Sequence, residues 1–437
     1  MVRKLSTQPY KGSRDFYPED MRARNYIFDI WRSVCKSYGY EEYDGPFLES
    51  FELYQAKSGE ELVNEQLYSF VDRGNRRVAV RPEMTPTLAR MVAAKYKALS
   101  FPVRWFSIPS LWRYEKPQRG RQREFFQLNV DILGVDEVLA DFEIVSVAVS
   151  IMKRAGAKEG MFELRVNNRK LMDDFYKILN FSEEQKKEFN KALDKKSKIS
   201  EDEFKKILTG RVGLNDGRLV EVNNLLNNPE QLLAKMLSEQ SPGAKEVKSL
   251  LKLAEEQKIE SFVKFDPTII RGLAYYTGIV FEQFDLNPQN TRAMFGGGRY
   301  NDLVSIFIED SIPATGFGMG DVTFWDFLIS WNLAPNFDSD LDYFMTKLPQ
   351  TNENATKEYY KITNLITEAI RNKNQTVMSW LDDNSKLDKQ LKFADKRGAK
   401  KVIILGESEI AEGNITVKDM ISKKQETLSL ENFIKSL

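Results

Sequence analysis

The 437-residue chain contains no histidine and a single cysteine. The absence of histidine excludes a Ser-His-Asp triad, a Cys-His pair, a histidine general base and every histidine-ligated metal. The lone cysteine, Cys35, excludes a disulfide framework and a cysteine-based zinc site. Any catalysis must therefore use arginine, lysine, carboxylates, tyrosine or a bound Mg²⁺ ion.

Segments that would direct the chain into or across a membrane are also missing. No apolar run reaches membrane-spanning length, and the first residues lack the apolar core of a signal peptide. Lys+Arg and Asp+Glu are equal at 64 each, so net charge argues neither for nor against a nucleic-acid partner. We therefore expect a cytoplasmic globular protein of two or three domains with no membrane contact.

The chain divides into regions of different pattern. Residues 1–331 mix helix and strand patterns, and a stretch rich in Lys, Glu, Asn and Leu at about 168–260 predicts a helical insertion within them. Residues 332–342 have the composition of a linker. Strand and helix patterns then alternate over 343–437, which predicts a small α/β domain.

The segment RGLAYYTGIVFE at 271–282 is the most informative of the chain. Glycine beside Arg271 indicates backbone brought close to a ligand, with a fixed cation next to it. The adjacent Tyr275 and Tyr276 would place hydroxyl groups on either side of the element that carries them. Taken alone, the segment fits a turn that enters a half-buried strand equally well.

A second segment, RYEKPQRGRQREFFQ at 113–127, concentrates arginines between two predicted strands. A hairpin with a cationic loop can hold a polyphosphate. Phe125 and Phe126 alternate across the returning strand, so one could stack on a base while its neighbour packs inward. A solvated basic hairpin is the other interpretation of such a charge run.

These segments resemble the motifs of class II aminoacyl-tRNA synthetases, and of the histidyl-tRNA synthetases in particular. The 113–127 segment is similar to motif 2, the 271–282 segment to the histidine-specific segment, and RPEMTP at 81–86 to the amino-acid-binding turn. Pro46 matches the motif 1 proline of the dimer interface, and residues 406–420 resemble the anticodon-binding domain. The motifs occur in the family's order, and the resemblance covers nearly the whole chain.

The resemblance implies a fold, domain boundaries and an activity. The expected fold is α+β: a class II catalytic domain at 1–331, with an antiparallel sheet flanked by helices, then the linker and an anticodon-binding α/β domain at 343–437. The implied enzyme activates L-histidine with ATP, with Mg²⁺ present, and transfers it to tRNA(His). A cytoplasmic homodimer is the implied assembly.

The resemblance also implies roles for individual residues. Arg113 and Arg271 would be catalytic, because both match arginines at the α-phosphate. The residues matching the ATP site are Arg113, Glu115, Arg121 and Phe125. The residues matching the histidine site are Glu83, Met84, Thr85, Gln127, Asp131, Arg271, Tyr275 and Tyr276. No resident metal ligand is expected.

Two positions depart from the family pattern. Ala274 stands where many relatives have Asp, and Thr323 stands where motif 3 has an arginine that lies over the adenine. Either another cation substitutes, with Arg299 and Arg123 as candidates, or ATP is held differently. The same departure fits an alternative function, a histidine-sensing regulatory paralogue of ATP phosphoribosyltransferase, although that paralogue generally lacks the C-terminal domain.

Overall fold

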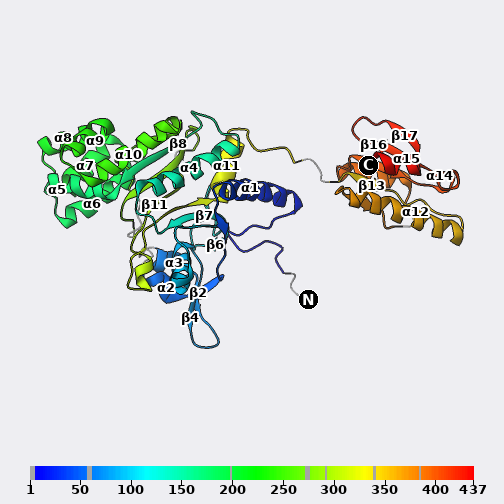
Figure 1. Ribbon diagram of the computed structural model, residues 1–437, viewed down its shortest axis with the longest axis horizontal. Helices are drawn as coiled ribbons and strands as arrows, with labels where there is room; N and C mark the ends of the chain where they lie inside the picture. Colours follow the sequence, from blue (N-terminus) through cyan, green and yellow to red (C-terminus); the bar gives the residue numbers. More distant parts are fainter. Residues whose placement is uncertain are drawn as a thin grey trace. The chain divides into compact units, whose positions relative to one another are not determined.

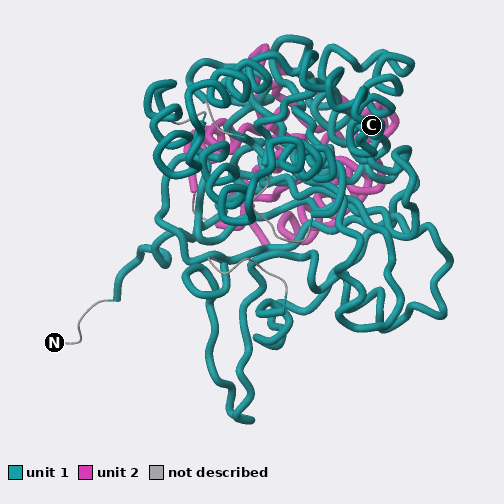
Figure 2. The backbone as a smooth tube through the Cα atoms, turned by 90° about the vertical axis from the view of Figure 1, so that its left-hand side faces the viewer, with its two compact units in different colours: residues 1–335 teal, residues 336–437 magenta. Residues whose placement is uncertain are grey.

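The computed structural model describes residues 5–56, 62–196, 199–270, 276–290, 293–337, 341–382 and 385–437 (Figure 1). The chain forms two compact units, Met1–Pro335 and Asn336–Leu437, which are coloured separately in Figure 2. Within the described ranges, no helix combines the length and the apolar character needed to cross a membrane.

Unit 1 is built on a large sheet whose strand order is β1-β5-β7-β12-β11-β10-β8-β9, with β6 beside β7. The interior pairs are antiparallel, as predicted, while the edge pairs β1–β5 and β8–β9 are parallel. The strands are β1 (Glu41–Glu42), β5 (Val103–Ser107), β6 (Ser110–Trp112), β7 (Glu124–Leu133), β8 (Phe162–Asn168), β9 (Val263–Phe265), β10 (Ile279–Asp285), β11 (Ala293–Arg299) and β12 (Ala314–Gly320).

Three helices outside the region rich in Lys, Glu and Leu pack with this sheet around the main core of unit 1. They are α1 (Pro18–Ser37), α4 (Val138–Arg154) and α11 (Asp321–Ser330). Trp31 of α1 is fully buried and lies 5.7 Å from the ring of Phe324 on α11. Cys35 is also fully buried, and desolvation raises the pKa of its thiol to about 12. The cysteine is therefore a small core side chain, as its sequence pattern indicates.

A second, three-stranded sheet of order β2-β4-β3 lies in the same unit and comprises β2 (Leu48–Ser50), β3 (Ser69–Val71) and β4 (Arg77–Val80). Ala79 on its inner face is fully buried with α2 (Phe51–Gln55), whereas Leu48 and Phe70 are more than two-fifths exposed. The chain then enters α3 (Thr85–Lys95), which begins without a side-chain cap. Thr85 is its first residue, so the hydroxyl is left for other contacts.

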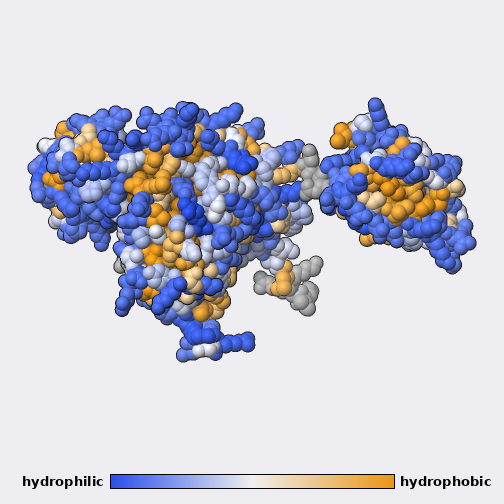
Figure 3. Space-filling model, in the orientation of Figure 1, coloured by the Kyte–Doolittle hydropathy of each residue, from blue (hydrophilic) through white to orange (hydrophobic). Residues whose placement is uncertain are grey.

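The described residues of the region rich in Lys, Glu and Leu form six helices with a core of their own. The helices are α5 (Arg169–Ile178), α6 (Glu183–Lys196), α7 (Glu201–Gly210), α8 (Asp216–Asn227), α9 (Pro229–Ser238) and α10 (Pro242–Glu256). Figure 3 shows that the visible surface of these helices is mainly hydrophilic. Helix α10 contacts both α5 and β8, and so joins the helical insertion to the main sheet.

Unit 2 contains a five-stranded sheet of order β14-β13-β15-β16-β17 among its described residues. Its elements are β13 (Tyr343–Met345), α12 (Glu353–Asn372), β14 (Val377–Ser379), α13 (Leu387–Lys396), β15 (Lys401–Ile404), α14 (Glu407–Glu412), β16 (Asn414–Asp419), β17 (Gln425–Ser429) and α15 (Leu430–Ser436). The strand–helix alternation up to β16 agrees with the sequence pattern. Strand β17 and the short helices α14 and α15 are not predicted by that pattern.

Candidate active site

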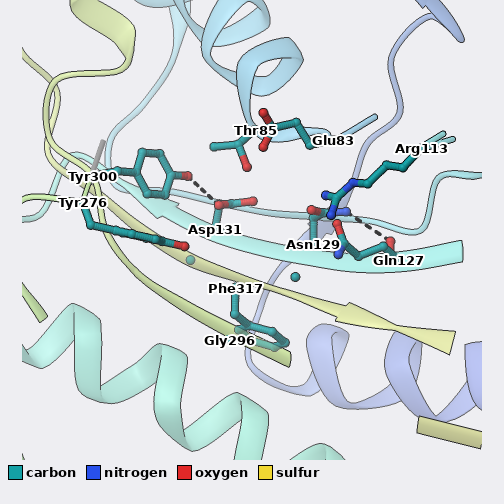
Figure 4. A pocket seen from close by; sticks show the side chains of 12 residues that line it. Glu83, Thr85, Arg113, Gln127, Asn129, Asp131, Tyr276, Gly296, Tyr300 and Phe317 are labelled. Carbon is teal, nitrogen blue, oxygen red and sulfur yellow. Dashed lines mark hydrogen bonds between the residues drawn. The ribbon is translucent and has the colours of Figure 1, made fainter. Parts of the chain in front are cut away.

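A polar pocket lies over the middle of the main sheet, with a volume of about 460 Å³ that includes solvent at its mouth (Figure 4). Most of its walls come from segments distant in the sequence: the start of α3, strand β7, and the glycine-rich strands β11 and β12. The pocket is lined by Glu83, Thr85, Arg113, Gln127, Asn129, Asp131, Tyr276, Gly296, Tyr300, Gly316, Phe317 and Gly318.

Strand β7 contributes Gln127, Asn129 and Asp131 to the pocket. Alternate residues of a strand face the same side, so this spacing places all three polar side chains together. The residues between them, including Leu128 and Val130, are fully buried in the main core on the opposite face. Nδ2 of Asn129 donates a hydrogen bond to the carbonyl oxygen of Gln127 (3.1 Å), which fixes the amide within the row.

Glycines in strand β12 make room for that row of polar side chains. Gly316 pairs with Asp131 in the ladder, and a Cβ atom at Gly316 would lie 2.1 Å from Oδ1 of Asp131. A Cβ atom at Gly318 would lie 2.8 Å from the amide carbon of Gln127. These glycines are therefore required by close approach of neighbouring side chains across the sheet.

Asp131 is the buried carboxylate of the pocket, with 4% of its surface exposed. Desolvation raises its pKa to about 7, although the Tyr300 hydroxyl, which donates to Oδ1 at 2.5 Å, favours the ionised form. Tyr300 follows β11 directly and reaches Asp131 across β12 (Figure 4). The carboxyl group thus has a fixed donor on one oxygen and titrates near neutral pH.

The segment before α3 places Glu83 and Thr85 on the wall facing the glycines (Figure 4). Glu83 is buried, with 6% of its surface exposed. Met84 between them is fully buried, and its methyl group lies beside Gly45. Met84 is not among the residues that line the pocket, and its place in the histidine site stays a prediction.

Arg113 enters the pocket from the side opposite Tyr276 (Figure 4). Its Nε donates to the carbonyl oxygen of Pro82 (2.9 Å), and its guanidinium lies 5.3 Å from the ring of Phe125. Glu115 and Arg121 form an ion pair with each other at 3.3 Å. The four residues predicted to bind ATP therefore lie close together, and of the four only Arg113 lines the pocket.

Part of the predicted histidine-specific segment lies outside the described residues. Arg271 and Tyr275 belong to that part, so their predicted roles are not tested by the structure. Tyr276 is described and lines the pocket. The next residue, Thr277, donates its backbone N–H to the carbonyl oxygen of Arg299 (2.8 Å), which ties this segment to the end of β11.

The structure excludes Arg299 as a replacement for the motif 3 arginine. Arg299 is 2% exposed, and its Nη2 donates to Asp141 at 2.6 Å behind the sheet. The guanidinium of Arg123 is also engaged in other contacts: it lies 4.1 Å from the ring of Tyr114 and donates a hydrogen bond to the hydroxyl of Tyr10. Thr323 itself donates to the carbonyl oxygen of Met294 at 3.0 Å.

Sequence reasoning missed several residues of this pocket. Asn129, Tyr300 and Phe317 line it but are not among the predicted site residues, although Tyr300 lies in GGGRYNDLV at 296–304 and Phe317 in ATGFGMG at 314–320. A signal was present in the alternating glycines of ATGFGMG at 314–320 and in GGG at 296–298, since a period of two puts small residues on one face of a strand. The glycine pattern therefore indicates a strand to which neighbouring side chains come close.

Comparison with solved structures shows the class of fold. The crystal structure of histidyl-tRNA synthetase from Nostoc sp. PCC 7120 superimposes with a TM-score of 0.81 at 24% identity, covering 99% of this chain and 100% of that one. An ATP phosphoribosyltransferase regulatory subunit/histidyl-tRNA synthetase from Bacillus halodurans gives 0.73 at 22% identity, covering 92% and 99%. The fold is therefore that of an aminoacyl-tRNA synthetase.

Sequence comparison narrows the class to one family. The family model described as histidyl-tRNA synthetase matches residues 12–320, and the anticodon binding domain model matches residues 349–437. The histidine–tRNA ligase of Leptospira biflexa serovar Patoc is 43% identical over 441 residues, covering 100% of this chain and 98% of that protein. The chain belongs to the histidyl-tRNA synthetase family.

Proposed function

We propose that this protein is a histidine–tRNA ligase, which activates L-histidine with ATP and transfers the histidyl group to the 3′ end of tRNA(His). The observation that carries the proposal is the pocket in which Asp131 and Tyr276 lie together at one end and Arg113 lies at the other. An imidazole needs polar partners at both ring nitrogens, and an adenylate needs a cation at its phosphate.

The histidine side chain would lie between Asp131 and Tyr276. One oxygen of Asp131 already accepts from Tyr300, which leaves the other for an imidazole N–H. Glu83, Thr85 and Gln127 would hold the ammonium group, since together they offer a buried carboxylate, a hydroxyl and an amide oxygen. We also propose contacts from Arg271 and Tyr275. A pocket with such fixed polar groups rejects side chains that cannot satisfy them.

Activation is an attack of the histidine carboxylate on the α-phosphate of ATP, with pyrophosphate as the leaving group. Little proton movement is needed, so alignment and stabilisation of charge are the main contributions of the protein. Arg113 would contact the α-phosphate, with Arg271 as the second cation. Phe125 would stack on adenine, Glu115 would read its edge, and Arg121 would turn from Glu115 to the γ-phosphate.

Transfer to tRNA requires removal of a proton from a ribose hydroxyl. A phosphate oxygen of the adenylate can accept it, so no side-chain base is required for this step. The anticodon-binding unit supports tRNA as the second substrate. Among the described residues, no group of three acidic or cysteine side chains is arranged to hold a metal ion. We propose that Mg²⁺ arrives bound to the phosphates of ATP.

Histidine-dependent exchange of pyrophosphate into ATP tests the proposed function. We expect exchange with L-histidine and none with other amino acids; no exchange, under conditions where a known synthetase is active, would contradict the proposal. Arg271→Ala should reduce exchange steeply while histidine binding weakens less, because the loss is in transition-state charge stabilisation. Exchange at the wild-type rate in this variant would remove the role proposed for Arg271.

The regulatory paralogue is the second candidate, and the absence of an arginine at Thr323 is the observation in its favour. The match of residues 349–437 to an anticodon-binding domain argues against it. The two functions predict different results in one assay. A sensor would bind histidine without forming an adenylate, whereas a ligase would produce AMP and histidyl-tRNA.

We further propose a homodimer that forms through the three-stranded sheet. Leu48, Val78, Val80 and Phe70 share one face by register, and Leu48 and Phe70 are 42% and 49% exposed. Exposed apolar residues gathered on one face are typical of an interaction surface. Light scattering should give twice the chain mass of 50.6 kDa, and Leu48→Glu should shift it towards monomer. A wild-type monomer would contradict this assembly.

A further inference from the structure

The N-terminal segment lies along the beginning of strand β7. The carbonyl oxygen of Gly12 accepts hydrogen bonds from the backbone N–H groups of Arg123 (2.8 Å) and Glu124 (3.0 Å). Gly12 has φ of +86°, and a Cβ atom there would lie 2.7 Å from Cγ of Arg123. Only glycine allows this close approach, so the N-terminal segment packs directly against the start of strand β7.

A buried carboxylate joins this segment to helix α11 and to β7. Asp321, the first residue of α11, is 3% exposed. Its Oδ2 accepts from Nη2 of Arg14 (2.8 Å), and its Oδ1 accepts from the backbone N–H of Phe126 (3.0 Å). Strand β12 ends at Gly320 opposite Gln127, so the carboxylate bonds β7 one residue beyond the ladder.

The ring of Phe126 is held by the same segment. Its centroid lies 6.0 Å from that of Phe16, and the guanidinium of Arg24 lies 5.0 Å from it. Phe126 is therefore fixed through its backbone by Asp321 and through its ring by Phe16 and Arg24. Its two neighbours in the strand are Phe125, proposed to stack on adenine, and Gln127, which lines the pocket.

We propose that Arg14, acting through Asp321, is a positioning residue for the ATP end of the active site. This role rests on the proposed function. The contacts that the N-terminal segment and Asp321 make at the start of β7 fall on residues 123–126, where β7 no longer pairs with β12. Residues 127–133, which carry the histidine end, are paired with β12 over their whole length. Loss of the Arg14–Asp321 pair should therefore disturb ATP binding far more than histidine binding.

The test compares Arg14→Gln with the wild-type protein in pyrophosphate exchange and in equilibrium binding of Mg·ATP by calorimetry. We expect the KM and Kd for ATP to rise about tenfold, the size expected for loss of one charged hydrogen bond, while the KM for histidine changes less than about twofold. Arg14→Lys should recover part of the loss because it keeps the charge. Lys264→Gln, which breaks a surface ion pair with Glu163, is the matched control and should leave all three constants unchanged.

Several results would overturn the positioning role. One is an equal rise in the constants for both substrates, and another is unchanged ATP binding in Arg14→Gln. A third is a fall in melting temperature without any shift in the constants. Calorimetry needs no turnover, so it tests Arg14 even if the wild-type protein fails to catalyse exchange. The failure of the proposed function and the failure of this inference are thus separate observations.

Discussion

The hydroxyl of Tyr300 donates a hydrogen bond of 2.5 Å to Oδ1 of Asp131, across strand β12. Gly316 of β12 pairs with Asp131 on one side and with Gly298 of β11 on the other, and it has no side chain to obstruct the contact. Asp131 is buried with a pKa raised to about 7, so this one bond orients a carboxyl group that is close to its titration point.

Asp131→Asn should make the protein more stable at alkaline pH. The folded-state pKa of about 7 lies above the ordinary value of about 3.9, so the folded protein binds more protons than the unfolded chain between these values. Wild-type stability therefore falls as pH rises through this window and stays lower above it. The advantage of the variant should grow by about 2–3 kcal/mol between pH 5 and 8, at about 1.4 kcal/mol per pKa unit. Urea unfolding at both pH values measures it, and a constant difference would contradict it.

Tyr300→Phe should weaken histidine binding and leave ATP binding nearly unchanged. The variant keeps the ring but removes the hydroxyl that donates to Asp131. In the wild-type protein this hydrogen bond stabilises the ionised carboxylate, so its loss should raise the pKa of Asp131 further. We expect a rise in the KM for histidine of about tenfold, as for loss of one hydrogen bond to a charged group. The acid limb of the pH profile for histidine should also move to higher pH. An unchanged profile would show that Tyr300 does not act through Asp131.

Gly316→Ala should damage both stability and histidine binding. The new Cβ atom would lie 2.1 Å from Oδ1 of Asp131 and 2.6 Å from the backbone oxygen of Val130, and that backbone is held in the sheet. We expect a loss of about 1–3 kcal/mol in the free energy of unfolding, typical of overpacking. Gly210→Ala is the control, because nothing lies within 4 Å of its Cβ position at the end of α7. Equal behaviour of the two variants would contradict the prediction.

Thr323→Arg should not improve the enzyme, although it restores the residue type of motif 3. The hydroxyl of Thr323 donates to the carbonyl oxygens of Met294 and Gly320, and Gly120 of the basic loop lies above its methyl group. A long cation would displace this loop, which Arg119 also ties to α11 through Asp326. We expect a higher KM for ATP in pyrophosphate exchange. A lower KM would show that the site still accepts an arginine.

The sequence by itself determined the class of chemistry and the order of the parts. The absence of histidine left arginines and carboxylates as the active groups, and the 113–127 and 271–282 segments carried the family resemblance. Periodicity predicted the helical character of the insertion and the strand–helix alternation over 343–437, because buried stripes and strand alternation are local patterns. The short exposed strand β17 and helix α14 have too little apolar periodicity to be predicted.

Only the tertiary structure decided which side chains share the pocket. Tyr300 and Gly316 lie more than 160 residues from Asp131 in the sequence but meet it in the fold, since sheet order, and not sequence order, sets such contacts. The fold also places Arg299 away from the ATP site, because its side chain points to Asp141 behind the sheet. The tertiary structure also brings Arg14 into a hydrogen bond with Asp321, 307 positions away in the sequence, which no local pattern could indicate.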